Sequence, residues 1–343
     1  MANKSLHAAK DAKNDEFYTR IEDINEEMNH YEDKFRDKIV FCNCDDPKWS
    51  NFWKYFHLNF EYLGLKKLIT THYEDGEVQT YKIEYEGGND EDFEDGVITP
   101  LTQNGDFRSP ECLALLDEAD IVVTNPPFSL FREYINVLVE HNKQFLIIGS
   151  FNNITYKDVF PLIVENKVWL GCRSLSRDMY FDVPDERKEW LVKNKKEGSA
   201  YKIVNGVVMG RLASACWYTN LDHKKRHNKI DTTYEYAKKD TLYPDLFQKY
   251  DNYDAINIDK INEIPMDYMG VMGVPLTFMD KYNPEQFEII WQASGNTYAN
   301  APEEIMTMLK FDPNVKYGGG LGAAVLNGKA KYTRLFIRRK QAD

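Results

Sequence analysis

Short apolar runs alternate with helical patterns between residues 38 and 149, and this alternation constrains the fold more than any other feature. Runs at 38–44, 68–71, 120–124 and 144–149 predict buried strands, while residues 51–62, 109–118 and 130–141 predict helices. Strands that alternate with helices indicate an α/β domain whose parallel sheet is covered by helices on both faces. Ligands of such domains bind beyond the carboxyl ends of the strands.

Four residues follow the apolar run 120–124 directly: Asn125, Pro126, Pro127 and Phe128. The prolines stiffen the loop and leave carbonyl acceptors without N–H donors. The Asn side chain adds an acceptor, and Phe provides a flat face for stacking. A planar NH₂ group can donate one hydrogen to Asn125 and one to the Pro126 carbonyl. On these four residues alone, a proline-rich turn after a core strand remains the alternative.

The length and composition favour an ordinary globular protein. A chain of 343 residues can bury an α/β core and carry one further module. No run approaches the roughly 18 apolar residues of a membrane span, and residues 1–13 lack the apolar core of a signal peptide. Five cysteines, an odd number without framework spacing, fit a reducing compartment. We therefore expect a cytoplasmic protein. A zinc site at Cys42 and Cys44 is disfavoured, because two further ligands are not evident.

Charge is unevenly distributed along the chain, whose net charge is −12. Residues 74–95 hold ten carboxylates and one lysine, whereas residues 329–340 hold six basic residues and no acid. A second basic stretch consists of His223, Lys224, Lys225, Arg226 and His227. Local potential decides whether a phosphate backbone can dock, so DNA binding remains open. The two histidines have the spacing of metal ligands on a helix, but the basic residues between them favour a phosphate-contacting loop.

Three segments supply groups suited to a methyl donor such as S-adenosylmethionine. Asp45, Asp46 and Pro47 close the first strand, near the expected position of the ribose or methionine end. Asp106 can accept a hydrogen bond from adenine N6 while Phe107 packs on the ring. Near the N-terminus, Thr19 and its neighbour Tyr18 can bind the methionine end. Each segment alone is more typical of a turn or loop, but their order on a parallel sheet favours a methyltransferase. No Gly-x-Gly pattern follows the first strand, which excludes a dinucleotide fingerprint.

The chain resembles the EcoRI-type adenine-specific DNA methyltransferases, the modification enzymes of restriction systems. The resemblance covers most of the length and is carried by DEFYT at 15–19, CNCDDP at 42–47, GDFRS at 105–109, TNPPFSLFREY at 124–134, TNLDHKKRH at 219–227, GVMGVP at 270–275 and YNPEQFEI at 282–289. It implies an α/β fold with a Rossmann-like S-adenosylmethionine-dependent methyltransferase core at 1–220 and a less regular C-terminal DNA-recognition module at 221–343. The first loop departs from related enzymes, which usually carry a glycine pair there.

The resemblance also implies roles for particular residues. Adenine N6 in duplex DNA is the implied acceptor, and the base must be flipped into the pocket to be reached. Phe128 would stack on it, Asn125 and Pro126 would hold its amino group, and Asn125 and Asn43 would also border the cofactor. Trp217 or Tyr218 is a candidate for the opposite wall, although a plain core role for Trp217 is at least as well supported.

The partners implied are double-stranded DNA and a separate cognate restriction endonuclease, with the enzyme itself a monomer and its site GAATTC-like. The rival functions are an RNA base or protein-glutamine methyltransferase, which also handles planar amines and amides, and a sequence-specific DNA-binding protein without catalysis.

Overall fold

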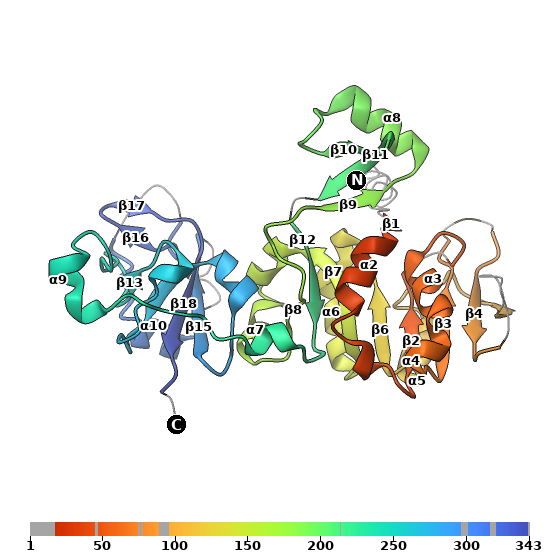
Figure 1. The fold of residues 1–343 in the computed structure, drawn as a ribbon, viewed down its shortest axis with the longest axis horizontal. Coiled ribbons are helices and arrows are strands. Elements are labelled where there is room, and N and C mark those ends of the chain that lie inside the picture. The colour runs from red at the N-terminus through yellow and green to blue at the C-terminus, as the bar shows by residue number, and fades with distance from the viewer. Residues whose placement is uncertain are drawn as a thin grey trace. The chain divides into compact units, whose positions relative to one another are not determined.

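The computed structural model describes residues 18–44, 47–74, 76, 78–88, 96–212, 214–295, 301–315 and 320–341. The chain divides into two compact units (Figure 1). The first consists of Met1–Val159 with Val168–His223, and the second of Phe160–Lys167 with Lys224–Asp343. In the described part of the chain, no helix is long and apolar enough to cross a membrane.

The first unit is built on an eight-stranded sheet in the order β5-β4-β3-β2-β6-β7-β12-β8. Its centre is parallel and consists of β3 (Lys67–Thr71), β2 (Ile39–Cys42), β6 (Ile121–Thr124) and β7 (Gln144–Ser150). Antiparallel pairings add β4 (Tyr81–Tyr85) and β5 (Val97–Pro100) on one side, and β12 (Ala215–Thr219) followed by β8 (Trp169–Leu170) on the other. The predicted strands are confirmed and form the parallel centre of the sheet, but antiparallel strands at both sides make the whole sheet mixed.

Helices cover both faces of this sheet, as predicted. On one face, α2 (Ile21–Met28), α3 (Asn51–Leu58) and α4 (Phe60–Leu63) contribute to a core cluster with inward residues of the central strands. Trp217 of β12 points to this face and contacts Phe52 edge-on, with ring centroids 6.0 Å apart. The next residue, Tyr218, points to the other face and meets Phe131 at 4.9 Å. Phe131 begins α6 (Phe131–Glu140), and α5 (Pro110–Glu118) precedes β6.

Local signals set most of these helix ends. The Ser50 hydroxyl accepts from the N–H groups of Phe52 and Trp53 at 3.1 and 3.2 Å, which caps α3. The single helix predicted at 51–62 is divided at Asn59, which leaves the helical conformation with φ −104° and ψ 12°. Gly64 adopts the left-handed conformation with φ +65° and ends α4.

A second sheet in the first unit has the order β1-β9-β11-β10. It contains β1 (Tyr18–Thr19), β9 (Met179–Asp182), β10 (Tyr201–Val204) and β11 (Val207–Leu212), and α8 (Asp185–Asn194) follows β9. Residues 173–198 are highly charged and show no clear pattern in the sequence, but the structure places β9 and α8 within them. We call residues 179–212 the arm; it rises from the end of the central sheet to which the β2 and β6 arrows point (Figure 1).

The second unit is a smaller mixed structure. Its sheet has the order β13-β14-β18-β15, formed by β13 (Ile256–Asn257), β14 (Met272–Pro275), β18 (Arg334–Arg339) and β15 (Phe287–Ala293). A hairpin, β16 (Val325–Leu326) and β17 (Lys329–Ala330), and the short helices α7 (Phe160–Val164), α9 (Lys239–Leu242) and α10 (Glu303–Met308) complete it. Tyr253 and Phe336, whose ring centroids are 4.8 Å apart, belong to its aromatic core.

Candidate active site

The strand order creates a topological switch point between β2 and β6. From β2 the chain proceeds to β3 on one side, whereas β6 and β7 lie on the other side of β2. Connections that diverge in this way leave a crevice at the carboxyl ends of the two strands, where open α/β sheets bind ligands. Asn43 follows β2 and Asn125 follows β6, so the structure brings these two predicted site residues to one edge.

The loop after β2 is tied to its neighbours by side-chain hydrogen bonds. The buried Asn43 Oδ1 accepts from the Tyr134 hydroxyl of α6, and the Asn43 carbonyl accepts from the Thr71 hydroxyl at 3.3 Å. The Cys44 N–H donates to Thr124 Oγ1 at 3.3 Å, which links this loop to the end of β6. Asp45 and Asp46, the acids predicted to touch the cofactor, lie outside the described residues, whereas Pro47 is buried.

The Asn125–Phe128 loop is held between a buried strand and a helix. Asn125 is 8% exposed; Pro126 is buried and Pro127 half-buried. The Leu130 N–H donates to the Pro127 carbonyl at 3.0 Å, which starts the single-turn 3₁₀ helix η2 (Phe128–Leu130) before α6. Phe128 is half-buried and packs against the core cluster of the first unit. The loop is therefore fixed in position, and its aromatic face remains partly accessible.

Asp106 and Phe107 lie beside this site. Phe107 is buried and meets Tyr134 edge-on, with ring centroids 5.0 Å apart. The Asp106 carboxylate accepts from the Arg108 N–H at 2.8 Å and from its guanidinium at 2.9 and 2.7 Å. These hydrogen bonds from Arg108 hold the pKa of Asp106 below its usual value. Asp106 is therefore ionised at neutral pH, and its orientation is fixed by Arg108.

The backbone just before Asp106 passes so close to the backbone of His72 that only glycine fits there. Gly105 has φ +76°, and a Cβ there would lie 2.3 Å from the carbonyl oxygen of His72. An alanine would therefore be strained in its backbone and would clash with backbone atoms.

The N-terminal segment reaches the same region through β1. Thr19 is 2% exposed, and within the described part of the chain its buried hydroxyl has no hydrogen-bond partner. The Thr19 carbonyl accepts from Asn51 Nδ2 at 2.7 Å, and Asn51 is the first residue of α3. The N-terminal segment is thus joined to the helix that follows the first loop. A buried hydroxyl in this state is costly unless a ligand satisfies it.

The structure does not gather the predicted DNA-contacting residues at this site. Trp217 is 1% exposed and belongs to the core. His223 is buried, with Nε2 2.9 Å from the Leu170 carbonyl oxygen.

The basic stretch that follows His223 lies in the second unit. Lys225 forms an ion pair with Asp280 at 2.7 Å, and His227 Nδ1 lies 2.8 Å from Glu285. Arg226 donates to Asn166 at 2.9 Å, and Lys224 is exposed. Contact of any of these residues with DNA remains a prediction. Among the described residues, no three His, Cys, Asp or Glu side chains are grouped to hold a metal ion.

Sequence reasoning did not identify the contacts that join the site together. Tyr134 connects Asn43 to Phe107, and Asn51 connects α3 to Thr19. Tyr134 was included only as part of a family-like segment. The only sequence signal that Tyr134 is buried was its position on the apolar face of α6.

Comparison with known proteins places the chain among the methyltransferases. The family described as "Adenine-specific methyltransferase EcoRI" matches residues 5–340. The Type II methyltransferase M.EcoRI of Escherichia coli is 41% identical over 350 residues, covering 99% of this chain and 97% of that protein. The Type II methyltransferase M.MpnI of Mycoplasma pneumoniae is 37% identical over 340 residues, covering 98% of each chain. No solved structure matches at a significant level. The chain belongs to the EcoRI family of adenine-specific methyltransferases, and the resemblance inferred from its sequence is confirmed.

Proposed function

We propose that this enzyme transfers a methyl group from S-adenosylmethionine to N6 of a flipped-out adenine in double-stranded DNA. The observation that carries the proposal is the convergence of the Asn43 and Asn125 loops at one switch point, joined by the bond from Cys44 to Thr124. A Rossmann-like core is supported by the parallel order β3-β2-β6-β7 with helices on both faces. Family membership directs the chemistry to adenine.

The residues at this edge fit S-adenosylmethionine. Its adenine amino group suits the ionised Asp106, its ring suits Phe107, and its polar methionine end suits the buried Thr19 hydroxyl. Asn43, Pro47 and the acids Asp45 and Asp46 would border the remainder, with Tyr18 next to Thr19. When bound, the cofactor supplies an electrophilic methyl group on a sulfonium centre.

The Asn125 loop would position the acceptor. The Asn125 side-chain oxygen and the Pro126 carbonyl accept the two amino hydrogens of adenine, while Pro127 holds the turn and Phe128 stacks on the base. Both acceptors orient the nitrogen lone pair toward the methyl group, so that catalysis rests on alignment and exclusion of water. No strong base is required early, because the amino proton becomes acidic once the nitrogen carries the methyl group. Flipping the base from the duplex costs a few kcal/mol.

We place target recognition in residues 221–343. The exposed Lys224, Lys329 and Lys340 support this placement, since phosphate contacts require cations. Lys225, Lys331, Arg334 and Arg338 form ion pairs with carboxylates. The resemblance to modification enzymes further supports a cytoplasmic enzyme that acts as a monomer beside a separate cognate endonuclease.

Tritiated methyl transfer to duplex DNA, RNA and protein tests the proposal. We expect label in duplex DNA, recovered as N6-methyladenine after nucleoside digestion. Label confined to RNA or protein would contradict the proposed substrate. Binding of duplex DNA without cofactor binding by calorimetry would instead identify a DNA-binding protein without catalysis.

A further inference from the structure

The arm shares a sheet with the segment proposed to hold the cofactor. In the pairing of β1 with β9, Tyr18 lies opposite Asp182 and Thr19 lies opposite Phe181. Met179 and Phe181 are buried in the core cluster of the first unit. The arm therefore starts beside the candidate active site, within the same compact unit.

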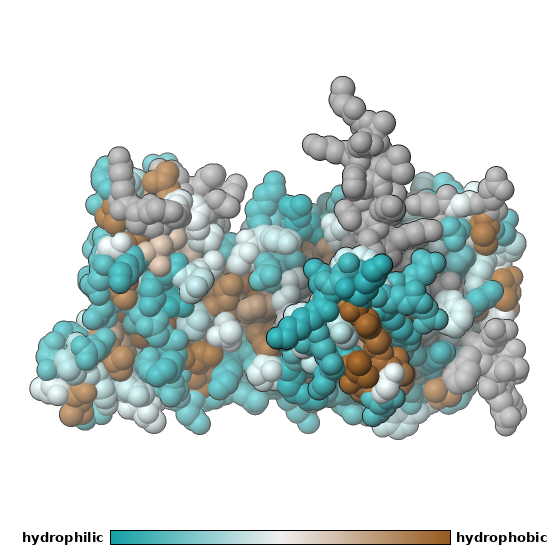
Figure 2. Space-filling view, turned by 90° about the horizontal axis from the view of Figure 1, so that it is seen from above, coloured by the Kyte–Doolittle hydropathy of each residue, from teal (hydrophilic) through white to brown (hydrophobic). Residues whose placement is uncertain are grey.

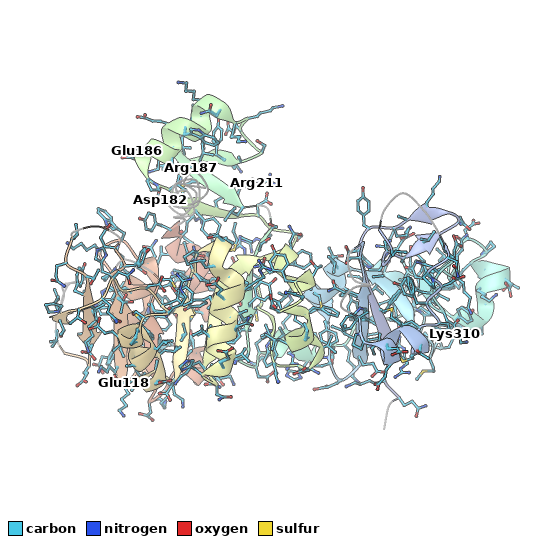
Figure 3. The ribbon with its side chains drawn as sticks, turned by 180° about the vertical axis from the view of Figure 1, so that it is seen from behind. Glu118, Asp182, Glu186, Arg187, Arg211 and Lys310 are labelled. Carbon is cyan, nitrogen blue, oxygen red and sulfur yellow. The ribbon has the colours of Figure 1, made fainter. Side chains whose placement is uncertain are left out.

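The base of the arm is fixed by polar contacts. Arg211 Nε lies 2.7 Å from Asp178, and the Arg211 guanidinium donates to the carbonyls of Gly198 and Ser199 at 2.8 and 3.0 Å. Val183, Leu191 and Tyr201 form a small core of the arm's own. Figure 3 labels Asp182 and Arg211 near the base and Arg187 on α8. These polar and apolar contacts hold the arm in a defined structure.

The end of α8 and the segment that joins it to β10 carry an excess of positive charge. Residues 193–202 contain four lysines, Lys193, Lys195, Lys196 and Lys202, and one carboxylate, Glu197. All four lysines are exposed. Among the described residues, no carboxylate lies within ion-pair distance of any of the four ammonium groups, whereas Lys188 of the same arm pairs with Asp182 and Asp185 at 3.1 Å. In a chain of net charge −12, this concentration creates a local positive potential that attracts an anionic partner.

Aromatic and aliphatic side chains lie among these lysines. Lys195 and Lys202 lie over the rings of Trp190 and Tyr180, at 5.5 and 5.6 Å from the centroids. Trp190, Val192, Ile203 and Val207 are exposed. Seen from above, the arm shows a hydrophilic surface crossed by a hydrophobic strip (Figure 2). Unpaired lysines beside apolar contacts match the phosphates and deoxyriboses of a nucleic-acid backbone.

We propose that the arm is a second DNA-contacting element, in which Lys193, Lys195, Lys196 and Lys202 bind backbone phosphates next to the target base. This inference rests on duplex DNA being the substrate. Under this proposal, the second unit recognises the DNA sequence, and the arm binds the duplex beside the Asn125 loop. Contacts of this kind add affinity without sequence preference.

The experiment compares K193Q/K196Q with K38Q/K66Q in the full-length enzyme. Lys38 and Lys66 immediately precede β2 and β3, and so lie at the amino edge of the sheet. Glu118 marks that edge at the opposite end of this unit from Arg211 (Figure 3). The affinity for duplex DNA is measured by fluorescence anisotropy over a series of salt concentrations.

Each phosphate contact contributes about 0.9 to the slope of log K against log salt concentration. K193Q/K196Q should therefore lose about 1.8 in slope and bind roughly 60-fold more weakly at 0.1 M salt. Its turnover at saturating DNA and its affinity for S-adenosylmethionine should be unchanged. K38Q/K66Q should match the wild type, and K193R/K196R, which keeps the charge, should retain the wild-type slope.

If the salt slope of K193Q/K196Q is unchanged while the wild-type enzyme methylates duplex DNA, the proposed role of the arm is wrong and the proposed function still stands. If the wild-type enzyme neither binds nor methylates duplex DNA, the proposed function fails first. A slope lost equally in K38Q/K66Q would also overturn the inference, because the effect would then follow net charge and not the position of the lysines.

Discussion

Replacing Tyr134 with phenylalanine tests how the candidate site is held together. The change keeps the ring that packs edge-on against Phe107 and removes only the hydroxyl that donates to Asn43 Oδ1. The thiol of Cys44, 3.7 Å from that oxygen, is a weak donor and cannot replace it. Leaving a buried acceptor without its strong partner costs about 1–3 kcal/mol. Because whole domains are stable by only about 5–15 kcal/mol, this loss is readily measurable.

The free energy of unfolding can be obtained from urea titrations followed by circular dichroism, and the cofactor affinity from calorimetry. We expect Y134F to lose about 1–3 kcal/mol and to bind S-adenosylmethionine roughly tenfold more weakly, equivalent to about 1.4 kcal/mol. Tyr62→Phe is the matched control, because its exposed hydroxyl donates to Glu32 at 2.8 Å. It should change stability by less than about 0.5 kcal/mol. If Y134F behaves like the control in both measurements, the hydroxyl does not organise the site.

Three further substitutions probe the proposed cofactor region. Thr19→Val should leave the free energy of unfolding unchanged or slightly raised, because it removes a buried hydroxyl that has no partner among the described residues. Calorimetry should show that this variant binds the cofactor more weakly. Unchanged cofactor binding would show that Thr19 does not belong to the site. Gly105→Ala should destabilise by at least about 1–3 kcal/mol in urea titrations, since its Cβ would lie 2.3 Å from the His72 carbonyl oxygen. Asp106→Asn should be less stable than the wild type at neutral pH. Hydrogen bonds from Arg108 lower the folded-state pKa of Asp106, so the stability that its ionisation provides is present above about pH 4 and is lost as pH falls further. The difference between D106N and the wild type should therefore shrink below about pH 4, and a difference independent of pH would contradict this assignment.

The central part of the first unit was predictable because its strands are covered on both faces. All four residues of β2 and of β6 are buried, and this gives continuous apolar runs that can be identified without a partner. The direction of a strand relative to its neighbours leaves no such signal. A long segment separates β12 from β8 in the sequence, and β12 lies between β7 and β8 in the sheet. Its antiparallel pairing with both strands was therefore not evident from the sequence.

The arm was missed for two different reasons. Leu191 is the only buried residue of α8 in the structure, so the helix has almost no apolar periodicity to detect. The hairpin from β10 to β11, in contrast, carried a clear signal. Asn205 and Gly206 have φ +51° and +81°, the conformation for which Asn-Gly is favoured in two-residue turns. The Asn205-Gly206 dipeptide is therefore a local sequence signal for this hairpin.

The candidate site was only partly predictable, since the sequence identifies groups but not their distant partners. Asn125 and Phe128 could be selected because a buried strand ends directly before them. Tyr134 and Asn43 are 91 positions apart and share a hydrogen bond only because β2 and β6 are neighbours. Local patterns carry no information about such a pairing.

The central claim is tested most directly by single-molecule sequencing of DNA from cells that express either the wild-type enzyme or Asn125→Ala. The account predicts N6-methyladenine at one recurring sequence with the wild-type enzyme and almost none with the variant, although the purified variant still binds the same duplex. Equal methylation by both proteins would contradict the role assigned to the Asn125 loop, and the absence of methyladenine with the wild-type enzyme would contradict the proposed function itself.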